Sequence, residues 1–119
     1  MASPNLLTST TVTGKTALAN CITSISSVIT NSASSNTVVK LNTIIFSNYS
    51  ASTTTANAII NRSGTSYYLG GTFSIPSNST LVLLGKDTSV YLEEGYILQT
   101  SASANSAVHM SAAYELIAT

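Results

Sequence analysis

Charged side chains are scarce in this chain. Of its 119 residues, four are Lys or Arg and four are Asp or Glu, so the net charge is zero. The charged share is 7%, against about a quarter in an average globular domain. The basic residues are scattered and form no run that would attract phosphates, which argues against a nucleic-acid partner. A surface with so little charge also lacks the self-repulsion that keeps monomers apart, so we expect a subunit of an assembly.

Cysteine and histidine occur once each, as Cys21 and His109. A single Cys excludes an intrachain disulfide, and one Cys with one His gives too few ligands for a zinc site. A catalytic thiol needs a nearby base, and nothing in the sequence brings Cys21 and His109 together. We therefore expect Cys21 to be a buried small apolar residue, and we predict that the chain holds no metal and no cofactor.

Acidic residues are equally few, and the sequence pairs none of them for acid–base chemistry. Glu93 and Glu94 are adjacent, but neighbours on a strand project to opposite faces, whereas a glycosidase needs two carboxyl groups that converge on one cleft. We predict a solvated turn at Glu93-Glu94-Gly95. A calcium site built from Asp87 with Glu93 or Glu94 is a weaker alternative. Without an acid–base pair, we predict no catalytic residue and no enzymatic activity.

The segment Gly14-Lys15-Thr16 matches the end of a phosphate-binding loop. The full motif has a Gly five residues before Gly14, and that position is Ser9. The loop should also follow a buried strand and open a helix, and the pattern indicates neither. We predict a glycine-containing turn between two strands instead.

A targeting segment is not indicated either. The first residues, Met1 to Asn5, contain no basic stretch. No apolar run reaches the length of a signal core or of a membrane span. We expect a chain that is made in the cytoplasm and has no membrane partner.

Ser and Thr make up about a third of the chain, and together with Val they favour extended backbone over helix. The clearest pattern lies in the last third, Thr80 to Ile117, where apolar residues recur at every second position. Four predicted strands follow one another there, each ended by a turn. They are Leu81–Leu84, Ser89–Leu92, Tyr96–Thr100 and Ala107–Ile117.

Strand patterns also occur upstream of Thr80. They cover Ala19–Thr30, Thr37–Ser47, Ala56–Asn61, Ser66–Leu69 and Thr72–Ile75. The second of these predicts a central strand, since both of its faces carry apolar residues. If side chains alternate regularly along Thr37–Ser47, one face of this strand carries Val39, Leu41, Thr43 and Ile45. A turn of about four residues, Arg62–Thr65, predicts a hairpin, and Gly70-Gly71 predicts a bulge.

These segments define one domain. Residues 1–10 are predicted to form an N-terminal arm or an edge strand, and residues 11–119 a single domain. Short strands separated by turns at intervals of about eight to twelve residues predict an all-β fold. We expect an antiparallel β-sandwich of about eight strands that is jelly-roll-like.

Tyrosine is the commonest aromatic residue, with six copies against two Phe and no Trp. Its apolar body and polar tip suit intermolecular contacts. Tyr67 and Tyr68 are adjacent and should point to opposite faces, so at most one of them joins any single patch. A carbohydrate- or host-surface-binding module is therefore an alternative, which the missing Trp weakens. The candidate interface residues are Leu6, Leu7, Tyr49, Tyr67, Tyr68, Tyr91 and Tyr96.

The segment Ile75–Ile117 combines several short motifs in a fixed order. They are Pro76–Thr80, Lys86-Asp87, Tyr91–Gly95, Ser101–Asn105 and Tyr114-Glu115. In this order the segment resembles small virion structural proteins of tailed phages, especially those that infect cyanobacteria. The opening, Ala2–Thr16, is also similar, and the middle of the chain is loosely so.

The resemblance implies a β-sandwich component of a virus particle, made in the host cytoplasm and carried in the virion, with no catalytic residues. The expected role is a capsid decoration (cement) protein, and a neck, tail or baseplate component is the alternative. The expected partners are other copies of the chain, as a homotrimer with closed symmetry, and the major capsid protein or other virion proteins.

Overall fold

The computed structural model describes residues 11–85, 87 and 89–118. Within these residues the chain forms nine strands and no α-helix, which confirms the predicted all-β class. No helix in this part of the chain is long and apolar enough to cross a membrane. The strands are β1 (Thr11–Cys21), β2 (Ser26–Thr30), β3 (Thr37–Asn48), β4 (Thr54–Arg62), β5 (Thr65–Ile75), β6 (Ser79–Leu84), β7 (Val90–Leu92), β8 (Tyr96–Ala102) and β9 (Val108–Ala118).

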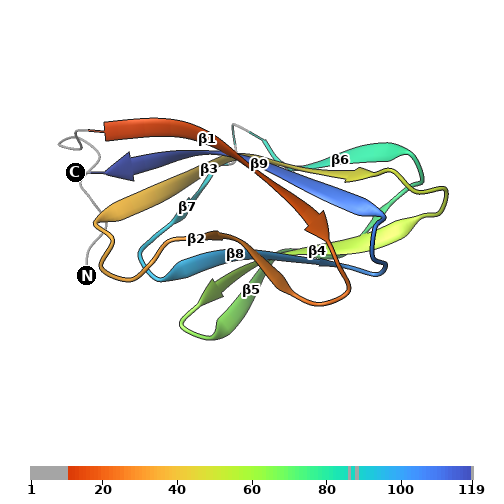
Figure 1. The fold of residues 1–119 in the computed structure, drawn as a ribbon, viewed down its shortest axis with the longest axis horizontal. Helices are drawn as coiled ribbons and strands as arrows, with labels where there is room; N and C mark the ends of the chain where they lie inside the picture. The colour runs from red at the N-terminus through yellow and green to blue at the C-terminus, as the bar shows by residue number, and fades with distance from the viewer. Residues whose placement is uncertain (1–10, 86, 88, 119) are drawn as a thin grey trace.

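The strands form two antiparallel sheets packed face to face (Figure 1). The first sheet has the order β1-β9-β3-β6, and the short β7 also pairs with β3. The second sheet has the order β2-β8-β4-β5. The strands β1 to β4 alternate between the two sheets. Later in the chain, β8 lies between β2 and β4 in the second sheet, and β9 lies between β1 and β3 in the first sheet. This order of interlocked Greek keys confirms the predicted sandwich and is jelly-roll-like.

The core lies between the inner faces of the two sheets. The ring of Phe46 from the first sheet meets the edge of Phe73 from the second, with centroids 4.9 Å apart and planes at 69°. Each large apolar side chain buried in this way stabilises the fold by about 1.5–3 kcal/mol. The largest fully buried apolar side chains of this core are Phe46, Leu41, Ile44, Ile75, Leu92, Leu98, Met110, Val39 and Val108.

A bulge in β3 overturns the predicted face assignment of that strand. The pairing of β3 with β9 shifts register between Leu41 and Thr43, so Asn42 is the extra residue. Alternation therefore restarts after the bulge. Val39 and Leu41 before it, and Ile44 and Phe46 after it, all belong to the core. The central position of β3, between β9 and β6, is as predicted.

The first two strands also differ from the prediction. β1 runs without a break from Thr11 to Cys21, so the predicted turn at Gly14 is wrong. Gly14 is paired opposite Glu115 on β9 like any other strand residue. The single strand predicted over Ala19–Thr30 is wrong as well. The chain leaves the first sheet after Cys21 and enters the second at Ser26, because the sandwich needs a crossing between its layers at this point.

The β4–β5 hairpin is tighter than predicted and carries the predicted glycine bulge. Its loop is only Ser63 and Gly64, both with positive φ (52° and 87°), as the tight hairpin turns that match strand twist require. The register of β4 against β5 shifts on both sides of Ala58, which lies opposite Gly70. At this bulge the Asn57 side-chain oxygen accepts a hydrogen bond from the backbone N–H of Thr72 at 2.6 Å.

The side chains of two buried asparagines hydrogen-bond the connecting loops to the strands. The Asn48 side-chain amide donates to the carbonyls of Ser52 and Ile75, both at 2.9 Å, and its oxygen accepts from the backbone and hydroxyl of Ser50. Asn31 donates to the carbonyls of Thr37 and Leu92 in the same manner. Because buried amides are costly unless all their groups are paired, each asparagine fixes the loops around it.

We expect Asn48→Ala to lower the free energy of unfolding by about 2–4 kcal/mol, because it removes the amide donor to the buried Ile75 carbonyl and the acceptor that holds Ser50. Urea unfolding followed by circular dichroism measures the change. The control is Asn20→Ala at an exposed position on β1, which should change stability by less than about 0.5 kcal/mol. Equal effects of the two substitutions would contradict the assignment.

Candidate functional site

Three of the predicted tyrosines line one hollow of about 230 Å³. We call it the tyrosine pocket. Its lining residues come from both sheets and are Ile60, Arg62, Tyr67, Val90, Tyr91 and Tyr96. It lies where the β4–β5 hairpin and β7 approach one end of the sandwich (Figure 1).

Strand register explains how the pocket forms. Tyr67 on β5 is paired opposite Ile60 on β4, and Arg62 is paired opposite Tyr96 on β8. Ile60 belongs to the core, so residues two positions along the same strand share its inward face. The inner face of the second sheet thus extends beyond the core as an aromatic wall. From β7, Val90 faces the core and lines the hollow, and its neighbour Tyr91, paired opposite Lys40 on the other face of the strand, lies at the edge of the hollow.

Polar groups border the aromatic walls of the tyrosine pocket. The Arg62 guanidinium carbon lies 5.9 Å from the centre of the Tyr96 ring, within the range of a cation–π contact. The Tyr96 hydroxyl donates to the Glu93 carboxylate at 3.4 Å. The lining therefore includes one cation and three tyrosines, and the Glu93 carboxylate lies next to the Tyr96 hydroxyl.

The two adjacent tyrosines separate as strand alternation predicts. Tyr67 lines the tyrosine pocket and is 54% exposed, while Tyr68 is paired opposite Ile59 on the outer face of the second sheet and is 58% exposed. Tyr68 therefore takes no part in the pocket.

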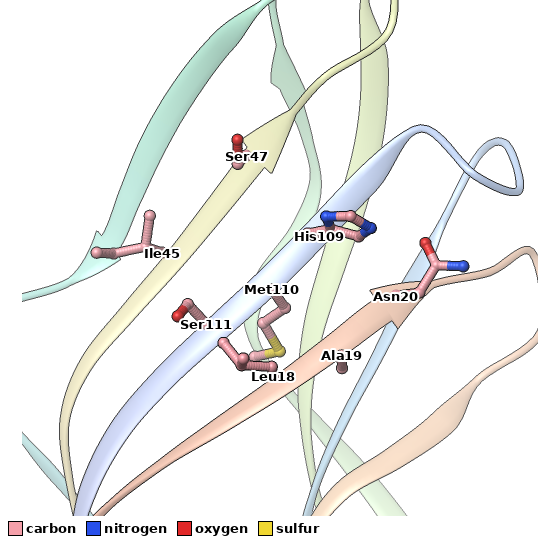
Figure 2. Close-up of a pocket in the computed structure, with 8 residues that line it drawn as sticks. All are labelled: Leu18, Ala19, Asn20, Ile45, Ser47, His109, Met110 and Ser111. Carbon is pink, nitrogen blue, oxygen red and sulfur yellow. The ribbon is translucent and has the colours of Figure 1, made fainter.

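A second hollow, of about 390 Å³, lies on the outer face of the first sheet. We call it the outer hollow. Figure 2 shows its lining side chains on the neighbouring strands β1, β9 and β3. They are Leu18, Ala19, Asn20, Ile45, Ser47, His109, Met110 and Ser111. His109 is the only ionisable side chain among these described lining residues.

An apolar row crosses the first sheet at the outer hollow. Leu18 is paired opposite Ser111, Ser111 opposite Ile45, and Ile45 opposite Val82 on β6. Leu18 is 79% exposed and Val82 is 58% exposed. Because Ser111 is short, the face is hollowed between larger apolar side chains.

Tyr49, another predicted interface residue, lies apart from the tyrosine pocket. Tyr49, just after β3, packs against His109 at the rim of the outer hollow, with ring centres 4.3 Å apart. His109 is exposed, as predicted for a surface histidine. Leu6 and Leu7 lie outside the described residues.

Cys21 and His109 lie on opposite faces of the first sheet. Cys21 is fully buried in the core, as predicted, and its sulfur lies 3.4 Å from the Thr100 hydroxyl. His109, paired opposite the preceding residue Asn20, projects outward. Burial raises the pKa of the Cys21 thiol, and the hydrogen bond with Thr100 offsets this only in part. The geometry therefore separates the thiol from its only possible histidine base.

The acidic turn after β7 has a structural function. Gly95 has a φ of 87°, and its N–H donates to the Asn31 carbonyl at 2.7 Å. The Glu94 carboxylate accepts from the backbone N–H of Asn36 at 2.5 Å. These bonds confirm a turn at Glu93-Glu94-Gly95 and join it to the loop after β2. Among the described residues, no group of three His, Cys, Asp or Glu side chains gathers as metal ligands would.

No protein-family model matches the chain, and no curated protein or solved structure matches it either. The two hollows are therefore the surface features on which a proposed function can rest.

The sequence predicted the three tyrosines of the pocket as contact residues, but it did not predict the other residues that line the pocket. Arg62 reaches Tyr96 only through the pairing of β4 with β8, which is not visible along the sequence. Leu18 and Ile45 in the outer hollow, and Val82 paired opposite Ile45, were missed for the same reason. The sequence signal that could have identified these residues is a large apolar side chain on the strand face opposite to the core residues.

We expect N-ethylmaleimide to label Cys21 at least ~100-fold more slowly in the folded protein than in urea, because the buried neutral thiol reacts only after opening. Mass spectrometry over a time course measures the rate. His109→Ala is the control and should leave the rate unchanged. A folded-state rate that falls with this substitution would show that His109 activates the thiol after all.

Proposed function

We propose that the protein is a non-enzymatic structural component of a virion, most specifically a capsid decoration protein that stabilises the phage head through subunit contacts. The observation that carries this proposal is the outer hollow, a mainly apolar surface on the outer face of the first sheet with no acidic or basic side chain except His109 in its described lining. Contiguous exposed apolar surface of this kind is typical of protein–protein contact sites. A neck, tail or baseplate component would use the same surface.

The scarcity of charge supports an assembly role. Burying a surface against a neighbour costs free energy when charges lose their water. The described lining of the outer hollow contains Ser, Asn, Ala and aliphatic side chains and a single histidine, so this cost is small. The motifs of Ile75–Ile117 support the same assignment through their resemblance to phage virion proteins.

The proposed assembly is a homotrimer with closed symmetry. Leu18→Lys together with Val82→Lys should convert it to a monomer, because two buried charges per subunit would lack partners. Both positions are exposed, so the fold should keep its stability within about 1 kcal/mol. Light scattering coupled to size-exclusion chromatography measures the mass. Ile25→Lys, at an exposed apolar position between β1 and β2, is the matched control and should leave the mass unchanged.

A monomeric wild type at every concentration would overturn the homotrimer. A wild-type oligomer that survives both substitutions would place the contact elsewhere on the molecule.

A decoration protein should also raise the heat resistance of the capsid. Heads assembled without this protein are mixed with the purified wild type, and DNA release on heating is followed by dye fluorescence. We expect release at a higher temperature with the wild type than without it, and no shift with the Leu18→Lys, Val82→Lys protein. Absence of binding to heads would exclude the decoration role, and binding to isolated tails would favour the alternative.

A further inference from the structure

The tyrosine pocket is a small site with aromatic walls and a polar rim, and the proposed assembly role makes no use of it. It faces the gap between the second sheet and β7, whereas the outer hollow lies on the outside of the first sheet. Ligand sites combine apolar walls with a few directed polar groups in the same manner. The pocket is therefore a candidate binding site in its own right.

From this arrangement we propose that the tyrosine pocket binds one ring of a neutral saccharide. A pyranose ring has an apolar C–H face and a rim of hydroxyl groups. Aromatic faces carry partial negative charge and attract the weakly positive C–H groups. The ring of Tyr67 lies on the inward face of the second sheet at this hollow and remains 54% exposed, so a sugar ring that enters the hollow can stack against it.

The rim determines the class of sugar. Sugar hydroxyls both donate and accept hydrogen bonds, so they need partners of both kinds. Arg62 supplies donors and Glu93 supplies acceptors, and Tyr96 contacts both groups, Arg62 through its ring and Glu93 through its hydroxyl. Because the nearby cation and anion offset each other, an acidic sugar gains no net attraction. The size of the hollow, about 230 Å³, suits a single ring better than a longer ligand.

The experiment titrates the full chain with methyl glycosides of glucose, galactose, mannose and N-acetylglucosamine, followed by NMR chemical shifts. Glucuronic acid, sialic acid and adenosine form the competing arms. Titration extends to ~50 mM because ligands of one ring bind weakly. We expect at least one neutral glycoside to bind, with shifts confined to β4, β5, β7 and the start of β8.

Variants separate the pocket from the rest of the surface. Tyr67→Ala should weaken binding about tenfold, as removal of a stacking ring typically does. Tyr96→Phe removes only the hydroxyl and keeps the packing of this partly buried ring. The matched control is Tyr68→Ala, which removes the adjacent exposed ring on the other face and should leave the affinity unchanged.

Three outcomes would overturn the proposal. They are no shift with any neutral glycoside, equal weakening by Tyr67→Ala and Tyr68→Ala, and tighter binding of an acidic sugar or adenosine than of every neutral glycoside. Each variant is first checked for wild-type thermal unfolding, so that a lost fold is not counted as lost binding. Since the oligomeric state is measured separately, failure here leaves the proposed assembly role intact.

Discussion

The register of β3 is the constraint on which both candidate surfaces depend. This strand pairs with β9, β6 and β7, and its bulge at Asn42 resets which side chains face inward. After the bulge, Ile44 and Phe46 enter the core and Ile45 projects outward into the outer hollow. Before it, Leu41 pairs with Val90 and so positions β7 at the tyrosine pocket. Without the extra residue, the inward and outward sets of one half of the strand would exchange.

Regular alternation explains why some strands were predicted from sequence and others were not. β9 pairs with β1 in unbroken register over eleven residues and alternates clearly in its first half, so the faces of His109 and its neighbours follow directly. β3 shows apolar residues on both faces because a bulge lies inside it, and a period of two cannot reveal where one residue is extra. β1 was misread because Gly14 has no side chain to indicate a face, although its backbone continues the strand.

The candidate sites depend on contacts between distant parts of the chain, and this limited their prediction. The tyrosines were recognisable as contact residues from their chemistry alone. Their convergence required strand pairings that bring Tyr67 to Tyr91 and Tyr96, which lie much later in the sequence. A pattern along the chain reports which face a residue occupies, whereas the neighbour across that face depends on topology. Tyr49 illustrates the same limit, since its contact with His109 joins residues sixty positions apart.

Neutral polar side chains, rather than charged ones, hold the loops of this fold in place. This use of neutral groups affects both the stability of the fold and the charge of its surfaces. Asn31, Asn48 and Asn57 hold loops and a bulge through amide hydrogen bonds that need no counter-ion. An ion pair in the same positions would carry a large desolvation cost, and its geometry would be less directional than that of the amide hydrogen bonds. With the interior secured by amides and hydroxyls, the sheet faces can remain almost free of charge. Such faces lose little when a neighbouring subunit covers them, which is why a chain with so few charges is suited to an assembly.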